Sequence, residues 1–264
     1  MRTNRIRLLA CLSLVTSIAS VCHASQPLET ESARLLKRGS VFVAAGFERQ
    51  SSTAGTEAAT PFAFEYGITD RLEIAVEPVA YSSIHDRGIL SQTGPGDMEI
   101  TLTRLLAPEL AGRPAFAIAG EVKLPTARNA RIGTGKADYA AFAIASKRVG
   151  AWDTHANLGY TFIGRPQGVA VNNVASFALA EEFHRSARFD VVAEVFGSTA
   201  AAKEGGEGVA PAASGVLTPE LGGGELVGAL GVRFHPAHAW TLSLGLSVDN
   251  QRAVLVHPGV ALKW

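Results

Sequence analysis

The stretch Trp240-Thr-Leu-Ser-Leu-Gly-Leu-Ser-Val248 decides the fold, because large apolar residues alternate in it with small polar ones. Successive side chains of a β-strand point to opposite faces, so the stretch predicts a strand with one apolar and one polar face. Eleven further segments share this period of two, and those at 137–148 and 172–183 alternate least regularly. The twelve predicted strands are 40–49, 59–69, 71–81, 96–106, 113–124, 137–148, 152–163, 172–183, 188–197, 225–235, 239–249 and 252–264.

The connections between these segments alternate in length. Outer-membrane barrels have long external loops and short periplasmic turns, and a strand of about 10 residues tilted by ~40° rises ~25 Å, the height of their apolar band. Hydrocarbon offers no partner for a free backbone N–H or C=O, so only a closed barrel can span it. The sequence therefore predicts an all-β transmembrane antiparallel barrel of about 12 strands over residues 39–264. The long connections are 50–58, 82–95, 125–136, 164–171 and 198–224.

The composition excludes two other classes of protein. The chain has 264 residues, 47% hydrophobic and 18% charged, yet after the N-terminal region no stretch reaches 18 consecutive apolar residues, which excludes a helical membrane protein. Three of the 24 basic residues and none of the 24 acidic ones precede residue 25. Because 21 basic and 24 acidic residues follow, nucleic acid is not an expected partner. A soluble periplasmic β protein is the alternative that composition leaves open.

The N-terminus has the pattern of a secretory signal peptide over residues 1–24. Arg2, Arg5 and Arg7 precede an apolar run, and Cys22-His23-Ala24 ends it with small residues at the cleavage positions. A lipid-anchored Cys11 or Cys22 is the alternative, but the apolar run before Cys11 is short and Val21 fits a lipoprotein box poorly. Residues 25–38 are then expected to form a short periplasmic helix or turn.

The three tryptophans support membrane insertion. Trp152 and Trp240 begin predicted strands and Trp264 ends the last one, so all three lie at the periplasmic end on the apolar face. Tyr81 and Tyr139 fall at the opposite ends of their strands. Amphipathic rings are enriched at the lipid headgroups, which makes outer-membrane lipid an expected partner, although a soluble core also uses tryptophan.

The chain ends in His257-Pro-Gly-Val-Ala-Leu-Lys-Trp264, which resembles the C-terminal assembly signal of Gram-negative outer-membrane barrels. The residues that carry this likeness are Gly259, Leu262 and Trp264. The resemblance implies recognition by the outer-membrane assembly machinery.

Over most of the mature chain the sequence resembles the MetA-pathway of phenol degradation family of outer-membrane barrels. The resemblance implies a barrel in the outer membrane and a role in the passage of hydrophobic or aromatic compounds, without catalytic or binding residues that can be transferred. It rests on Glu29-Thr-Glu-Ser-Ala-Arg-Leu-Leu-Lys-Arg-Gly39, Glu65-Tyr-Gly-Ile-Thr-Asp-Arg-Leu-Glu73, Gly94-Pro-Gly-Asp97, Lys123-Leu-Pro-Thr126 and Asn157-Leu-Gly-Tyr160.

The polar face of each predicted strand supplies candidate lumen residues. The acids on predicted strands 2 to 5 would form one acidic stripe, which either favours cations and neutral solutes over anions or belongs to a charge network that plugs the barrel. The candidates are Glu65, Glu73, Glu77, Glu99, Glu121, Lys123, Asp153, His155, Asn157, Asp190, Glu194 and Arg233.

No catalytic, cofactor or metal site is predicted. Asp153, His155 and Asn157 share one face of a strand, but that face points into the lumen, and Ser176 and Ser186 match no nucleophile motif. The seven histidines show no metal-ligand spacing. We therefore expect an outer-membrane channel or transporter for small solutes, possessing no enzyme activity. A structural or plugged barrel is the first alternative and a barrel lipid hydrolase the second; the oligomeric state is not predicted.

Overall fold

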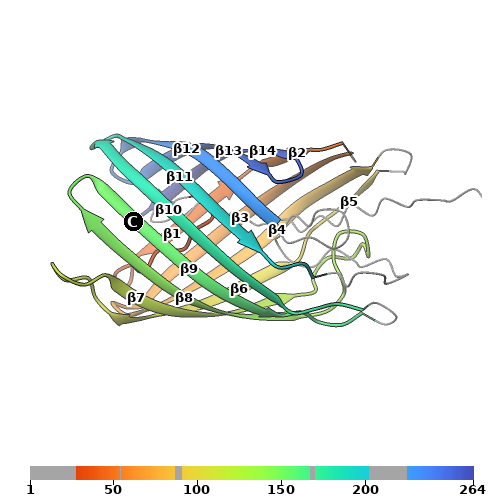
Figure 1. The fold of residues 1–264 in the computed structure, drawn as a ribbon, viewed down its shortest axis with the longest axis horizontal. Helices are drawn as coiled ribbons and strands as arrows, with labels where there is room; N and C mark the ends of the chain where they lie inside the picture. The colour runs from red at the N-terminus through yellow and green to blue at the C-terminus, as the bar shows by residue number, and fades with distance from the viewer. Residues whose placement is uncertain (1–27, 54, 87–90, 167–169, 202–224) are drawn as a thin grey trace, which may run out of the picture.

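The computed structural model describes residues 28–53, 55–86, 91–166, 170–201 and 225–264, and it consists of antiparallel strands. Figure 1 shows these strands tilted around a common axis. The predicted signal peptide and residues 25–27 lie outside the described residues. The strands are β1 (Val41–Gly46), β2 (Glu48–Ser51), β3 (Gly55–Thr69), β4 (Leu72–Asp86), β5 (Gln92–Gly94), β6 (Met98–Ala107), β7 (Ala115–Leu124), β8 (Asp138–Val149), β9 (Trp152–Phe162), β10 (Val174–Ser186), β11 (Phe189–Ser198), β12 (Glu225–Ala237), β13 (Trp240–Asp249) and β14 (Val254–Lys263).

The strands close into a barrel of twelve wall strands. β1 and β2 both pair with β3 and β14, so they form one wall strand interrupted at Phe47. β5 and β6 both pair with β4 and likewise form one wall strand. The ring closes between β1 and β14, from Phe42 opposite Lys263 to Gly46 opposite Gly259. The predicted all-β antiparallel barrel and its strand number are confirmed.

The two faces of the wall differ as the alternation predicts. In β13, Leu242, Leu244 and Leu246 are 45–51% exposed, whereas Thr241 and Ser247 on the other face are buried. Trp152, Trp240 and Trp264 are exposed at the periplasmic strand ends, and Tyr139 is exposed at the opposite end. The outer surface is therefore an apolar band with aromatic residues at both edges, which suits contact with lipid.

Tyr81 faces outward, although simple alternation along residues 71–81 would place it on the same face as Glu73 and Glu77. The pairing of β3 with β4 shifts by one residue, because Thr60 pairs with Tyr81 while Pro61 pairs with Val79. Such a β-bulge exchanges the two faces beyond it. Val79 and Ser82 are consequently buried, whereas Tyr81 is 44% exposed.

The segment before β1 lies inside the barrel, which differs from the periplasmic location expected from the sequence. Residues 28–38 contain bends and extended backbone, followed by a turn at residues 38–39, and no helix is described there. Leu28, Ala33 and Leu36 are each at most 3% exposed. We call residues 28–38 the lumen strap. Within the described part of the chain, no helix is long and apolar enough to cross a membrane.

Candidate functional site

All twelve residues predicted to line the lumen lie on the inner face of the wall. The acidic stripe runs across neighbouring strands, because Glu77 on β4 is opposite Glu99 on β6, and Glu99 is opposite Lys123 on β7. Glu65 on β3, Glu73 on β4 and Glu121 on β7 lie on the same face. One side of the lumen is therefore strongly acidic.

Lys123 is the base that compensates part of this acidic wall. Its side chain is 1% exposed, and its Nζ lies 2.8 Å from Asp138 Oδ2 and 3.2 Å from Asp97 Oδ2. The other oxygens of the two acids accept backbone N–H groups, at 2.7 Å from Gly164 and 2.9 Å from Ala127. Hydrogen bonds and ion pairing together make this burial of charge tolerable.

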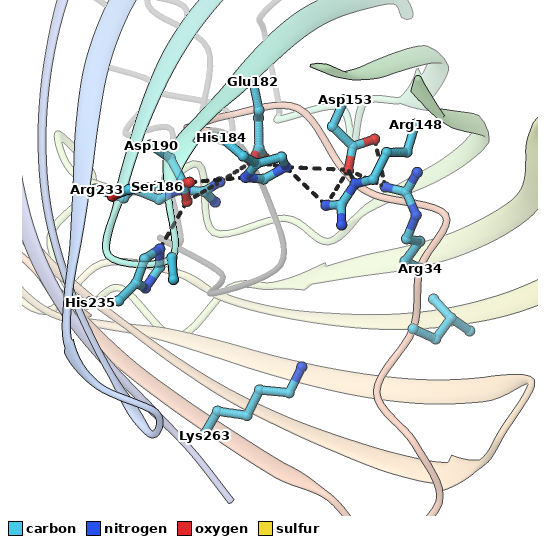
Figure 2. A pocket seen from close by; sticks show the side chains of 12 residues that line it. Arg34, Arg148, Asp153, Glu182, His184, Ser186, Asp190, Arg233, His235 and Lys263 are labelled. Atoms are coloured by element: carbon cyan, nitrogen blue, oxygen red, sulfur yellow. Dashed lines mark hydrogen bonds and ion pairs between the residues drawn. The ribbon is translucent and has the colours of Figure 1, made fainter. Parts of the chain in front are cut away.

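A cavity of about 600 Å³ opens at the periplasmic end of the lumen (Figure 2). It lies between the strap, the ends of the wall strands and the short turns, and most of its lining is charged. The lining residues are Arg34, Leu35, Arg148, Asp153, Glu182, His184, Ser186, Ala187, Asp190, Arg233, His235 and Lys263.

Asp190 is the centre of one half of this charged lining. Its Oδ1 lies 2.9 Å from His184 Nδ1, and its Oδ2 lies 2.8 Å from His235 Nε2. Arg233 lies 3.5 Å from Asp190 and is in close contact with Glu182. Figure 2 shows these side chains converging at one side of the cavity.

Asp153 is the centre of the other half. Arg148 reaches its Oδ2 through Nε at 2.9 Å and Nη2 at 2.6 Å, and Arg34 from the strap reaches the same carboxylate at 2.7 Å. Arg34 also binds Glu109, in the turn between β6 and β7, at 2.7 Å. The strap is thereby tied to the periplasmic end of the barrel.

The contacts of Glu109 predict that the free energy of unfolding depends on pH. Although burial alone would raise its pKa, hydrogen bonds from Arg34, the Arg148 backbone and Lys147 lower the pKa of Glu109 to about 2. A carboxyl group whose pKa is lower in the folded state stabilises the protein at pH values above its unfolded-state pKa of 4.5. This contribution is lost as the pH falls towards 2.

We therefore expect Glu109→Gln to lower the urea midpoint at pH 6 and to leave it nearly unchanged at pH 2. The measurement is urea unfolding of the two proteins in lipid over this pH range. A difference in urea midpoint between the two proteins that stays constant across this pH range would contradict the lowered pKa of Glu109.

The family of the chain follows from a match to a family model over residues 24–216, which is most of its length. The model is described as "Putative MetA-pathway of phenol degradation". The chain belongs to this family. A search of curated proteins gives no match.

The fold of this family member matches that of solved outer-membrane porins. The NanC porin is 10% identical with a TM-score of 0.57, covering 83% of this chain and 98% of that one. The KdgM porin in complex with disordered oligogalacturonate is 6% identical with a TM-score of 0.53, covering 84% of this chain and 98% of that one. These likenesses show a porin-like barrel fold, and the apolar outer band with aromatic residues at both edges indicates that the barrel lies in the outer membrane.

Three groups at the cavity have a spacing that could hold a metal ion. One donor atom each from Glu182, His184 and Asp190 lie within 4.8 Å of one another. Arg233 already contacts both acids, while His184 Nε2 accepts a hydrogen bond from Arg148 and His184 Nδ1 donates one to Asp190. A cation would compete with the guanidinium groups, so we interpret this cluster as an ion-pair network.

Sequence reasoning missed several members of these networks. Asp138 and Glu182 lie on β8 and β10, the two strands whose alternation is least regular, so the pattern did not assign their faces. His184 and His235 lie next to short turns, beyond the regular part of their strands. Arg34 lies in a segment expected outside the barrel. Parity within the strand was an available signal for two of these residues, because Asp138 has the parity of buried Ala140 and Glu182 has that of buried Ala180.

Proposed function

We propose that the protein allows small neutral or cationic solutes with an apolar or aromatic part to cross the outer membrane by diffusion through its lumen. The observation that carries this proposal is an inner wall that presents two kinds of surface. An acidic side lies on β3, β4, β6 and β7, and an apolar patch, which we call the apolar side, lies among charged residues on β11 and β12.

The acidic side supports a preference against anions. Glu65, Glu73, Glu77, Glu99 and Glu121 lie on neighbouring wall strands, and Lys123 is the one base among the predicted lumen residues there. A ring or stripe of carboxylates repels anions and attracts cations entering a narrow pore.

The apolar side supports the solute class. Val192 and Phe196 on β11 and Val227 on β12 point inward and form one cluster with Ala229. Such a surface gives an apolar or aromatic solute a place to desolvate, at about 25 cal/mol per Å² of buried apolar area. The family name, which refers to phenol degradation, fits this class.

Liposome swelling with refolded residues 25–264 tests the proposal. Phenol-like neutral aromatics and small amines are expected to enter faster than benzoate-like anions of matched size. The matched control is a set of neutral polar solutes, such as sugars of similar mass. Faster entry of anions, or no entry of any solute through a folded barrel, would contradict the proposal.

One observation favours a second candidate, a hydrolase. Ser146 Oγ lies 2.8 Å from His155 Nδ1, and His155 Nε2 lies 3.6 Å from Asp153 Oδ1. Ser146 and His155 are each 1% exposed and do not line the cavity, and the strap residue Ala33 donates its N–H to Ser146 Oγ. A nucleophile that is covered in this way cannot meet a lipid, so we place the hydrolase second. Labelling by a fluorophosphonate that is lost in Ser146→Ala would reverse this order.

The C-terminal residues are proposed to direct assembly. Gly259 and Leu262 lie in β14, and Trp264, which follows it, is 60% exposed at the periplasmic end. The exposed ring of Trp264, together with Gly259 and Leu262, is the feature that we propose the assembly machinery recognises.

A further inference from the structure

The lumen strap crosses the barrel from one side of the wall to the other. Leu36 N donates to Glu73 Oε2 on β4 at 2.6 Å, and Glu29 N donates to Glu194 Oε2 on β11 at 2.9 Å. In the ring of twelve wall strands, β4 and β11 are six positions apart. The two strands are therefore opposite each other, and the strap lies across the path of any solute.

Wall side chains satisfy the backbone of the strap along its length. The amides of Leu28, Glu29 and Thr30 all donate to the Glu194 carboxylate. Glu31 exchanges two hydrogen bonds with the Asn157 side chain, at 2.6 and 2.9 Å. Buried backbone groups need such partners, and here residues of the wall supply them in place of water.

The wall also provides an apolar seat for each apolar strap residue that is buried. These seats are exceptions in a lumen that is otherwise rich in charge, and each is occupied by one strap side chain. Leu28 packs on Val192, Phe196, Val227 and Ala229, Ala33 packs on Ala115, Ala117, Ala119 and Ile144, and Leu36 packs on Phe42, Ala44, Ala63 and Ala261.

Two glycines of the wall make room for the strap. A Cβ on Gly67 would lie 2.2 Å from the carbonyl oxygen of Lys37, and a Cβ on Gly231 would lie 2.8 Å from Leu28 Cδ1. The first contact is with backbone, which cannot move away without displacing the strap. The wall and the strap are thus complementary in shape as well as in polarity.

The strap joins the wall at the periplasmic end through a turn at residues 38–39. Gly39 has a φ of +80°, a conformation that glycine adopts at little cost. Arg38 N donates to Asp70 in the turn between β3 and β4, and Arg34 holds Glu109 and Asp153. Releasing the contacts beyond Arg34 would let residues 28–33 leave the middle of the lumen without unpairing any wall strand.

We propose that the lumen strap is an internal closure that limits passage through the pore, and that displacing it opens the lumen. This inference rests on the proposed transport function. The apolar seat of Leu28 is the same surface that we assign to apolar solutes, so strap and solute compete for it.

The first test compares single-channel currents of refolded residues 25–264 with those of the same chain lacking residues 28–37, in planar lipid bilayers. The deletion is expected to raise the conductance at least threefold. The double variant Glu194→Ala/Asn157→Ala, which removes acceptors of the strap, is expected to open more often. Glu225→Ala is the matched control, because this inward carboxylate on β12 makes no described hydrogen bond to the strap, and it is expected to behave like the wild type.

A second measurement locates the strap directly. Residues 25–264 contain no cysteine, so Ala33→Cys introduces a single thiol at a position that is 1% exposed. Maleimide labelling of this variant is expected to be at least tenfold slower than that of Arg38→Cys, at the exposed rim. Adding Glu194→Ala/Asn157→Ala is expected to speed the labelling at position 33.

The outcomes separate the strap from the transport function. If the wild type passes solutes and the deletion variant folds but has the same conductance, the proposal that the strap closes the lumen is overturned. The proposed transport function is then unaffected. Absence of current from both proteins overturns both proposals. Where the deletion does not fold, the double variant decides: unchanged currents and unchanged labelling at position 33 overturn the strap.

Discussion

Leu244→Arg is expected to destabilise the folded barrel by ~2–4 kcal/mol, because it places a charge near the middle of the lipid-facing band. Leu244 is midway along β13 and 51% exposed, between Leu242 and Leu246 on the same outer face. In lipid this surface is covered by hydrocarbon, in which a guanidinium has no partner. The free energy of unfolding is measured by urea titration in lipid vesicles, with the folded fraction read from the gel shift of unheated samples.

The control for this prediction is Ser243→Arg, on the adjacent residue and the opposite face. Ser243 lies on the inner face of the wall, which already carries charged groups. We therefore expect Ser243→Arg to lower the free energy of unfolding by less than half as much as Leu244→Arg. Equal losses would contradict the assignment of the two faces. A chain that stays folded and soluble without lipid or detergent would contradict the membrane assignment itself.

Lys123→Met is expected to lower the free energy of unfolding by ~3–5 kcal/mol, because it leaves buried charges without their partner. The substitution keeps most of the side-chain volume but removes the ammonium that lies 2.8 Å from Asp138 and 3.2 Å from Asp97. Both carboxylates would remain beside the acidic stripe. The same urea titration measures the change.

Two further variants test whether the loss comes from charge. Lys147→Met breaks an ion pair with Glu109 in which both side chains are about a quarter exposed, so we expect at most ~1 kcal/mol. Adding Asp97→Asn and Asp138→Asn to Lys123→Met is expected to recover much of the stability. A triple variant as unstable as Lys123→Met would show that packing, not charge, accounts for the loss.

The charge networks explain why the sequence predicted the lumen residues but not their partners. The parity of β7 and β9 placed Lys123 and Asp153 on the inner face. Which carboxylate Lys123 meets depends on the register between β7 and β8, where Lys123 is opposite Asp138. That register comes from strand pairing, which alternation within one strand does not contain.

The sequence by itself determined the barrel, its twelve wall strands and the facing of most side chains. These properties are local, since a period of two along about ten residues fixes which side chains meet lipid and which meet the lumen. The position of the strap was decided by the tertiary structure alone. Residues 28–38 have no period of two, and their partners Asn157 and Glu194 are 126 and 166 residues away from Glu31 and Leu28. The closed ring brings those partners together, and their unpaired acceptors and apolar seats then bind the segment, so it lies inside the barrel rather than in the periplasm.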